Sequence, residues 1–224
     1  AADERPQKMT PGGSAPPSQF VRSAFWAVLT AVSFAIMMTS VRSMEGKFDA
    51  FEIVFFRAIV GLFMVIPLVS RFGIGALKTT RMPMHVVRTL FGLFAMATLY
   101  YALVIIRPGV AEISLPVLLV VLSSALYAGS WSSVKILTRT DSAAVTVFWL
   151  NVLMVPLTAI PLIFLWVTPD WSDAPALLVM ALSGWSAHFC QARAFEKSDA
   201  SAVMPFDFLR LPLGVLFGFV LFGE

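Results

Sequence analysis

Residues 121–135 read VLSSALYAGSWSSVK and residues 28–42 read VLTAVSFAIMMTSVR, so the chain contains one stretch twice. Five of the fifteen aligned positions are identical, and four more keep the chemistry of the side chain, as in Arg42 and Lys135. The correspondence continues downstream, pairing 54–56 with 147–149, 66–68 with 160–162, Gly92 with Gly184 and Ala102 with Ala194. Both copies are strongly apolar, and paired repeats in a membrane chain are typical of transporters.

The composition predicts a membrane protein. Hydrophobic residues make up 58% of the chain and charged residues 13%, about half the charged fraction of a soluble domain. The net charge of +3 comes from basic residues scattered between apolar runs, which argues against a nucleic-acid-binding face. The single cysteine, Cys190, excludes an internal disulfide, and His85 and His188 lie far apart. No metal site and no cofactor is therefore predicted.

The chain divides into a polar tail and a series of apolar segments. Residues 1–20 are rich in Pro, Gly, Ser and charge, which predicts a disordered cytoplasmic tail with no signal peptide. Beyond the tail, each apolar segment approaches the ~20 residues that a helix needs to cross a bilayer. The seven segments lie at 22–41, 51–70, 84–106, 113–136, 143–167, 174–195 and 200–222. The predicted fold is an all-α polytopic bundle of transmembrane helices.

Lysine and arginine orient the bundle. With a cytoplasmic N-terminus, the inner regions carry eleven Lys or Arg residues and the outer loops only Arg42, Lys47 and Arg107. This bias follows the positive-inside rule, and a bacterial-type inner membrane is the expected location. Three spans separate the starts of the two copies, so the copies run in opposite directions across the membrane. The chain is therefore predicted to contain an inverted-topology repeat.

Several motifs, taken in order, resemble the EamA branch of the drug/metabolite transporter superfamily. They are VFFRA at 54–58, Gly92 followed by YAL at 101–103, IIRPG at 105–109, PFD at 205–207 and LFGE at 221–224. The resemblance extends over nearly all of 22–224. It implies ten helices in two inverted five-helix repeats, with a substrate cavity near the midplane of the membrane between them.

The chain departs from the family pattern at two places. Leu103 runs directly into Val104, where the family has a fourth helix and most of a fifth, and a tenth helix is absent after Glu224. The second copy indicates that about 50 residues are absent at the junction, counting one further span of ~20 residues. We therefore divide the chain into a first repeat at 21–103, incomplete after Leu103, and a unit at 104–224 formed by the end of a fifth helix and the second repeat. A genuine deletion and residues left out of this sequence are both open explanations.

Charged side chains within apolar spans are costly and mark candidate functional sites. Asp207 and Arg210 are three residues apart on one predicted helix and can pair. In one interpretation they face the substrate cavity, where Arg210 binds an anionic group of the substrate; in the other they only neutralise each other. Arg57 lies about 10 Å from the outer end of its helix. We expect it to be a structural intramembrane charge that reaches outward or pairs with Glu52.

Polar and aromatic side chains complete the predicted cavity. His188, Gln191 and Trp185 share one face of the sixth segment, where they form either a cavity wall or ordinary interhelical contacts. The resemblance also assigns to the cavity the segments that carry Tyr100, Tyr127 and Trp131.

Four glycines are predicted to allow neighbouring helices to approach closely. They are Gly92, Gly184 and the two glycines of a GxxxG motif, Gly214 and Gly218.

The function predicted from these features is secondary transport. The sequence has no nucleophile elbow, phosphate-binding loop or paired-carboxylate site, so an enzyme is not expected and transport would draw on a gradient. We expect alternating access for small metabolites, with amino-acid-like or carboxylate-bearing solutes as the class and export favoured over uptake. The alternative is a non-transporting structural subunit of a larger membrane complex, derived from a transporter. The expected partners are the substrate and the bilayer, with no nucleic acid; a homodimer or larger membrane assembly stays open.

Overall fold

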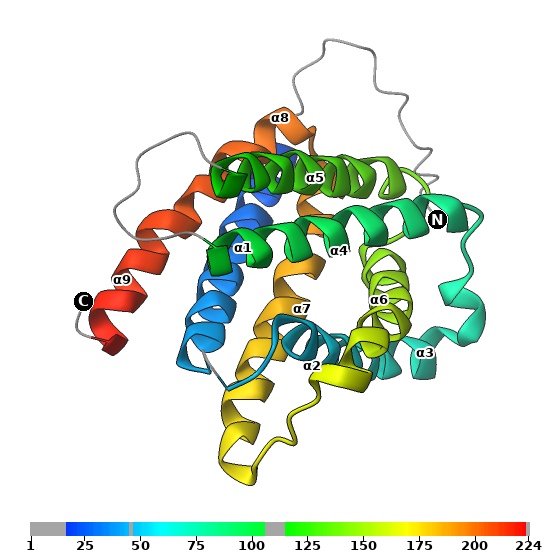
Figure 1. Cartoon of the computed structure of the whole chain (residues 1–224). Helices are drawn as coiled ribbons and strands as arrows, with labels where there is room; N and C mark the ends of the chain where they lie inside the picture. Colours follow the sequence, from blue (N-terminus) through cyan, green and yellow to red (C-terminus); the bar gives the residue numbers. More distant parts are fainter. Residues whose placement is uncertain (1–16, 45–46, 106–114, 223–224) are drawn as a thin grey trace, which may run out of the picture.

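The structure, a computed structural model, describes residues 17–44, 47–105 and 115–222 (Figure 1). Within these residues the regular structure is entirely helical, which confirms the predicted all-α bundle. The predicted N-terminal tail lies outside the described residues except for 17–20, which already belong to the first helix. The elements are α1 Pro17–Ser43, α2 Ala50–Phe63, α3 Ile66–Phe72, η1 Ile74–Leu77, α4 Met82–Ile105, α5 Leu115–Leu137, α6 Ala143–Leu165, η2 Trp171–Asp173, α7 Ala174–Lys197, α8 Ala200–Val203, η3 Met204–Leu209 and α9 Arg210–Phe222.

Proline breaks two of the predicted segments. The segment at 51–70 is interrupted between α2 and α3, and Pro67 lies in the first turn of α3. A proline nitrogen has no hydrogen to donate, so proline is favoured in the first turn of a helix, although α6 continues through Pro156 and Pro161. In the last segment, Pro205 lies in the first turn of η3, and the chain continues as α9 from Arg210.

Five segments of the described chain are long and apolar enough to cross a membrane: Gln19–Ser43, Met82–Leu99, Val117–Leu137, Ala143–Leu165 and Ala200–Val220. The other two predicted spans, 51–70 and 174–195, do not meet this criterion, each for its own reason. Helix α2 has only 14 residues. Helix α7 has 24 residues, but polar side chains such as His188 and Gln191 lower its hydropathy. Because α7 packs against α1, α2 and α6, these polar groups lie on the helix with the most protein neighbours.

The repeat is visible in how the helices begin. Asp49 caps α2, and its side chain accepts a hydrogen bond from the backbone N–H of Phe51 at 2.9 Å. Ser142, at the corresponding position of the second copy, caps α6 and accepts from the backbone N–H of Val145 at 3.4 Å. A capping side chain satisfies a backbone donor that has no partner within the helix. The two copies therefore start equivalent helices with equivalent chemistry.

The two copies are also interleaved. The repeat pairs α1 with α5, α2 with α6 and α4 with α7. The most extensive helix contacts are α1 with α7 and α4 with α5, which are the same contact made once by each copy, followed by α2 with α6 (Figure 1). Each helix thus packs mainly against a helix of the other copy. This is the arrangement expected of a pseudo-two-fold repeat.

Individual glycines follow the same pseudo-symmetry. A Cβ atom placed on Gly92 would lie 3.5 Å from Oγ of Ser130, across the α4–α5 contact. A Cβ atom placed on Gly184, the repeat counterpart of Gly92, would lie 2.9 Å from Sδ of Met37, across the α1–α7 contact. Met37 is in turn the counterpart of Ser130 at the offset of 93 residues. Both glycines therefore lie at the contact of equivalent helix pairs.

The Leu103–Val104 junction lies inside α4, which runs without a break to Ile105. The described residues thus join Val104 and Ile105 to α4, where the family pattern has the end of a separate fifth helix. The remainder of the IIRPG motif and Glu224 lie outside the described residues.

Candidate functional site

A small cleft opens between α1, α5, α7 and the turn formed by α8 and η3. Its free volume is about 10 Å³, far below the ~300–1,000 Å³ of typical ligand pockets, so the walls must move apart to admit a metabolite. Three of its residues, Trp131, Gln191 and Asp207, belong to the cavity predicted from the sequence. The lining comprises Ala27, Thr30, Trp131, Gln191, Val203, Met204 and Asp207.

Trp131 is the largest ring at the cleft. Its indole stacks on the ring of Phe34 from α1, with centroids 6.2 Å apart and an interplanar angle of 14°. The guanidinium carbon of Arg210 lies 5.8 Å from the indole centroid, within the range of a cation–π interaction. The tryptophan therefore has both an apolar ring and a cation as neighbours.

Asp207 and Arg210 form the predicted pair. Oδ2 of Asp207 lies 3.2 Å from the Arg210 guanidinium. The other carboxylate oxygen, Oδ1, is buried and has no hydrogen-bond partner among the described residues. Asp207 thus pairs with Arg210 and also lines the cleft, whereas Arg210 is not part of the lining. A buried acceptor without a donor is costly in a protein interior, and a ligand donor in the cleft would satisfy it.

His188 lies next to the cleft. Its ring contacts the ring of Phe34 edge-on, with centroids 5.5 Å apart. Phe34 also stacks on Trp131. Nε2 of His188 lies 2.6 Å from the NH1 nitrogen of Arg57. Phe34 therefore contacts both Trp131, which lines the cleft, and His188, which is hydrogen-bonded to Arg57.

The remaining predicted aromatic residues lie elsewhere. Trp185 stacks face to face on Phe189 of the same helix, with centroids 5.1 Å apart, and does not line the cleft. Tyr127 lies on α5, one turn before Trp131, and is likewise absent from the lining. The side chain of Tyr100 lies outside the described residues.

Arg57 belongs to α2, and its side chain packs against α7. Its Cδ and Cγ atoms are 2.7 Å and 3.2 Å from where a Cβ atom of residue 184 would be, so the missing side chain of Gly184 makes room for it. Glu52, its predicted alternative partner, accepts a hydrogen bond from the backbone N–H of Val167 at 3.2 Å. The guanidinium thus binds an imidazole inside the bundle, a contact that the sequence did not indicate.

The predicted GxxxG contact has no support in the described residues. No heavy atom lies within 4 Å of a Cβ atom placed on Gly214 or Gly218. Helix α9 instead leaves a broad apolar surface exposed, including Val215, Phe219 and Val220.

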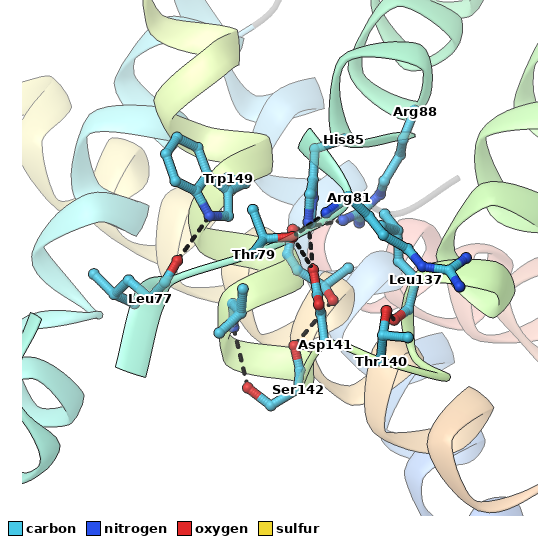
Figure 2. A network of polar contacts seen from close by, with 12 residues as sticks. Leu77, Thr79, Arg81, His85, Arg88, Leu137, Thr140, Asp141, Ser142 and Trp149 are labelled. Carbon is cyan, nitrogen blue, oxygen red and sulfur yellow. Dashed lines mark hydrogen bonds and ion pairs between the residues drawn. The ribbon is translucent and has the colours of Figure 1, made fainter. Parts of the chain in front are cut away.

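Figure 2 shows a polar network that the sequence did not predict. Asp141, between α5 and α6, accepts from the hydroxyl of Thr79 at 2.6 Å and from Nε2 of His85 at 2.8 Å. The indole N–H of Trp149 donates to the backbone oxygen of Leu77 at 3.0 Å. His85 and Asp141 are both buried. The network fixes the segment between α3 and α4 against the start of α6.

Curated relatives of the chain are bacterial transporters. It is 25% identical over 258 residues to a riboflavin transporter of Brucella anthropi, covering 90% of this chain and 87% of the relative. It is 31% identical over 170 residues to a riboflavin transporter of Vibrio cholerae, covering 73% of this chain and 54% of the relative. It is 21% identical over 252 residues to an S-adenosylmethionine uptake transporter of Rickettsia prowazekii, covering 92% of this chain and 86% of the relative.

The chain is thus similar to multi-pass carriers of small metabolites rather than to enzymes, in agreement with the absence of a catalytic motif from the sequence. No family model matches the chain, and no solved structure shows significant similarity to it.

The alignments leave many positions of the relatives without a counterpart in this chain. The alignment with the Brucella protein runs over 258 positions but takes in 90% of this chain, which is about 202 of 224 residues. About 56 positions of that relative therefore have no counterpart here. The alignment with the Rickettsia prowazekii protein runs over 252 positions and takes in 92% of this chain, about 206 residues. About 46 positions of that relative therefore have no counterpart here.

Proposed function

We propose that the chain is a gradient-driven transporter of the bacterial inner membrane that takes up a small metabolite carrying a flat ring system. The observation that carries this proposal is the cleft at the contact between the two copies. It places the indole of Trp131 in one lining with Asp207, whose Oδ1 is unsatisfied, and with the buried Gln191. Such a surface suits a ring that also carries hydrogen-bond donors, because the ring stacks while the polar groups fix its orientation.

The names of the relatives support this substrate class. Riboflavin and S-adenosylmethionine, the solutes named for the relatives, both contain a planar heteroaromatic ring. Uptake replaces the export favoured in the sequence analysis, because the Rickettsia relatives are named uptake transporters. A carboxylate-bearing solute stays within the proposed class, since Arg210 lies beside the cleft.

Alternating access is the mechanism that the repeat supports. Two inverted copies that pack against each other can rock about a site between them, so the site opens to one side of the membrane at a time. The cleft lies at the α1–α7 and α5–α7 contacts, between helices of both copies. Membership of the EamA branch, a cytoplasmic N-terminus and ten helices in the complete fold belong to the same proposal.

We place the unmatched residues of the relatives at the Leu103–Val104 junction, where the repeat lacks its fourth helix. Their number, about 46 to 56, agrees with the ~50 residues inferred from the second copy. The mass of the protein purified from its natural source tests this placement. A value near 24.5 kDa would contradict it and would favour a shortened, non-transporting subunit.

Uptake of radiolabelled riboflavin into proteoliposomes tests the function, with radiolabelled S-adenosylmethionine as a second substrate. We expect uptake above that of empty liposomes for at least one of them. Trp131→Ala is expected to lower that uptake at least about tenfold, since a lost ring contact of ~1.5 kcal/mol corresponds to that factor. Trp131→Phe keeps a ring and is expected to stay within about threefold of the natural protein.

Trp171→Ala is the matched control, because Trp171 is 95% exposed in the turn before α7. Its uptake is expected to equal that of the unaltered protein. No uptake of either substrate, or equal losses at residues 131 and 171, would refute the proposed site.

A further inference from the structure

A polar link joins the two copies at the start of α6. Asp141, in the turn before α6, accepts from the hydroxyl of Thr79 at 2.6 Å and from Nε2 of His85 at 2.8 Å (Figure 2). Asp141 belongs to the second copy, whereas Thr79, before α4, and His85, in the first turn of α4, belong to the first. We call these three residues the Asp141 link. It fastens the start of α4 to the start of α6.

A second polar link joins the copies at the other end of α6. Nζ of Lys47, in the turn before α2, lies 2.9 Å from Asp170 and 2.6 Å from Asp173, both in the segment between α6 and α7. We call these three residues the Lys47 link. Helix α6 has 23 residues, which at 1.5 Å for each residue gives a length of about 34 Å. Because this exceeds the ~30 Å of hydrocarbon in a bilayer, the two links lie on opposite faces of the membrane.

The two links are the same contact, made once by each copy. Each copy has a short helical turn ahead of its inner helix, η1 before α4 and η2 before α7. In each link, the segment that contains this turn binds the turn before α6 or α2 of the other copy. The chemistry is reversed, because Asp141 accepts hydrogen bonds from its partners, whereas Lys47 donates to two carboxylates. The pseudo-symmetry of the repeat therefore extends to the links.

A further contact accompanies each link at equivalent positions. Phe56 and Trp149 are counterparts at the offset of 93 residues, and each lies at the same distance from the start of its helix. The indole N–H of Trp149 donates to the backbone oxygen of Leu77, ahead of Thr79, at 3.0 Å. The ring of Phe56 packs on Trp166, just after α6, with centroids 5.7 Å apart. Both faces of the bundle are thus held by an equivalent pair of contacts between the copies.

The cleft lies between the two faces. Thr30, which lines it, is the midpoint of α1, thirteen residues from either end. With both links formed, the cleft has a free volume of about 10 Å³, too small for a metabolite. Inverted copies open a site to one face at a time, so contacts between the copies at that face must separate while those at the other face hold.

We propose that the two links are the gates of transport. The Asp141 link closes the site toward the face that carries the α5–α6 turn, and the Lys47 link closes it toward the opposite face. Opening toward one face breaks the link at that face and keeps the other. This inference rests on the proposed function, because it assigns gating residues to the alternating access proposed above.

Labelling of a thiol in the cleft tests the gates. Thr30→Cys provides the thiol in the full chain, and Cys190, the one natural cysteine, is replaced by alanine. A membrane-impermeant maleimide is applied to one face in right-side-out membranes and to the other in inside-out vesicles. The readout is the ratio of the two labelling rates, which reports how often the cleft opens to each face.

Thr79→Val removes one hydrogen bond of the Asp141 link at nearly constant size. It is expected to shift the ratio about three- to tenfold toward the face of the α5–α6 turn, the effect of one buried hydrogen bond. Asp141→Asn weakens both hydrogen bonds of that link and is expected to shift the ratio in the same direction. Lys47→Met is expected to shift it the opposite way by about two- to threefold, because an exposed ion pair contributes less.

The controls make the same changes at exposed residues outside the links. Thr80→Val, next to Thr79, and Lys197→Met, at the end of α7, are expected to leave the ratio unchanged. Shifts in the same direction at 79 and 47, shifts no larger than those of the controls, or a thiol that neither face can reach in any variant would overturn the proposal. Labelling needs no substrate: opposite shifts without uptake of riboflavin or S-adenosylmethionine would refute the substrate class alone, and normal uptake without shifts would refute the gates alone.

Discussion

Arg57 lies across Gly184, with its Cδ atom 2.7 Å from the place where a Cβ atom of residue 184 would be. The methyl group of an alanine at 184 would meet Arg57 on one side and Met37, at 2.9 Å, on the other. Real Cβ atoms do not approach heavy atoms so closely, so one of the neighbours would have to move. If Arg57 moves, it leaves His188.

Gly184→Ala is therefore expected to lower the melting temperature, in spite of alanine's better helix propensity. Overpacking of this kind costs about 1–3 kcal/mol, or a few degrees for each kcal/mol in a chain of this length. Thermal unfolding in detergent measures it.

Gly214→Ala is the matched control, because nothing lies within 4 Å of its added methyl group. It is expected to leave the melting temperature unchanged or to raise it, by up to ~1 kcal/mol of helix propensity. Gly92→Ala, with an ordinary contact of 3.5 Å to Ser130, is expected to lie between the two. If Gly184→Ala melted at the same temperature as Gly214→Ala or at a higher one, the packing described for α1, α2 and α7 would be contradicted.

Asp141→Ala tests the network of Figure 2. The change leaves the buried His85 and the hydroxyl of Thr79 without their shared acceptor, at distances of 2.8 Å and 2.6 Å in the natural protein. Loss of a buried, hydrogen-bonded carboxylate is expected to cost about 3 kcal/mol, seen as a fall in melting temperature of several degrees. Thr140→Ala, at the exposed neighbouring residue, is expected to change it by less than ~0.5 kcal/mol. Equal effects at 140 and 141 would show that the network adds little to stability.

The link between two loops is expected to depend on pH and salt. Lys47 Nζ lies 2.6 Å from Asp173 and 2.9 Å from Asp170. The hydrogen bond to Lys47 lowers the pKa of Asp173 below its ordinary 3.8, and the hydrogen bonds to Asp173 and Asp170 raise the pKa of Lys47 above 10.5. The stabilisation is therefore complete between about pH 4 and pH 10, is lost as the pH falls through the lowered pKa of Asp173, and is lost again as it rises through the raised pKa of Lys47.

Melting of the natural protein and of Lys47→Ala across this range checks that expectation. The difference between them is expected to be small, constant from pH 5 to pH 9, and to shrink as the pH falls below about 4. Molar salt is expected to reduce it, because exposed charges are screened. A difference that grows toward low pH would have the wrong sign for this link.

Asp207→Asn is expected to lower transport while the protein still folds. The change removes the charge that pairs with Arg210 and alters the unsatisfied oxygen at the cleft, but both side chains are partly exposed, so little stability depends on the pair. We expect at least a tenfold fall in substrate uptake with a melting temperature within about 2 °C of the natural protein. Asp170→Asn, in a loop position with its side chain 74% exposed, is expected to transport normally. Normal uptake by the asparagine variant at 207 would remove Asp207 from the site.

The architecture could be predicted from the sequence because its signals are local or periodic. Apolar runs of fixed length locate the helices, and the repeat of 28–42 in 121–135 pairs them. Polar and charged positions within apolar spans selected Gln191 and Asp207, and the family resemblance selected Trp131; the structure brings all three to one cleft from three elements. Charged or polar residues in apolar spans are rare enough to single out without knowledge of their neighbours.

Contacts between distant residues could not be predicted in this way. His85 and Asp141 are 56 residues apart, and Arg57 and His188 are 131 apart. Which polar side chains meet depends on helix rotation and crossing, and in the second pair on the room that Gly184 leaves. The stacking of Trp185 on Phe189 is different, because residues four apart on a helix are neighbours and this pair was visible in the sequence.

The interleaving of the two copies has a consequence for the newborn chain. Helix α1 ends at Ser43, and its main partner, α7, begins at Ala174. At synthesis rates of 5–20 residues per second, the ribosome needs roughly 6 to 26 s to make the intervening chain. Through that interval the side of α1 that carries Met37 and packs on α7 has lipid or a chaperone against it, while Phe34 can already stack on Trp131 of α5. Helices α4 and α5 are adjacent in the chain and can join first, so the packing of α1 is completed only when the last quarter of the protein reaches the membrane.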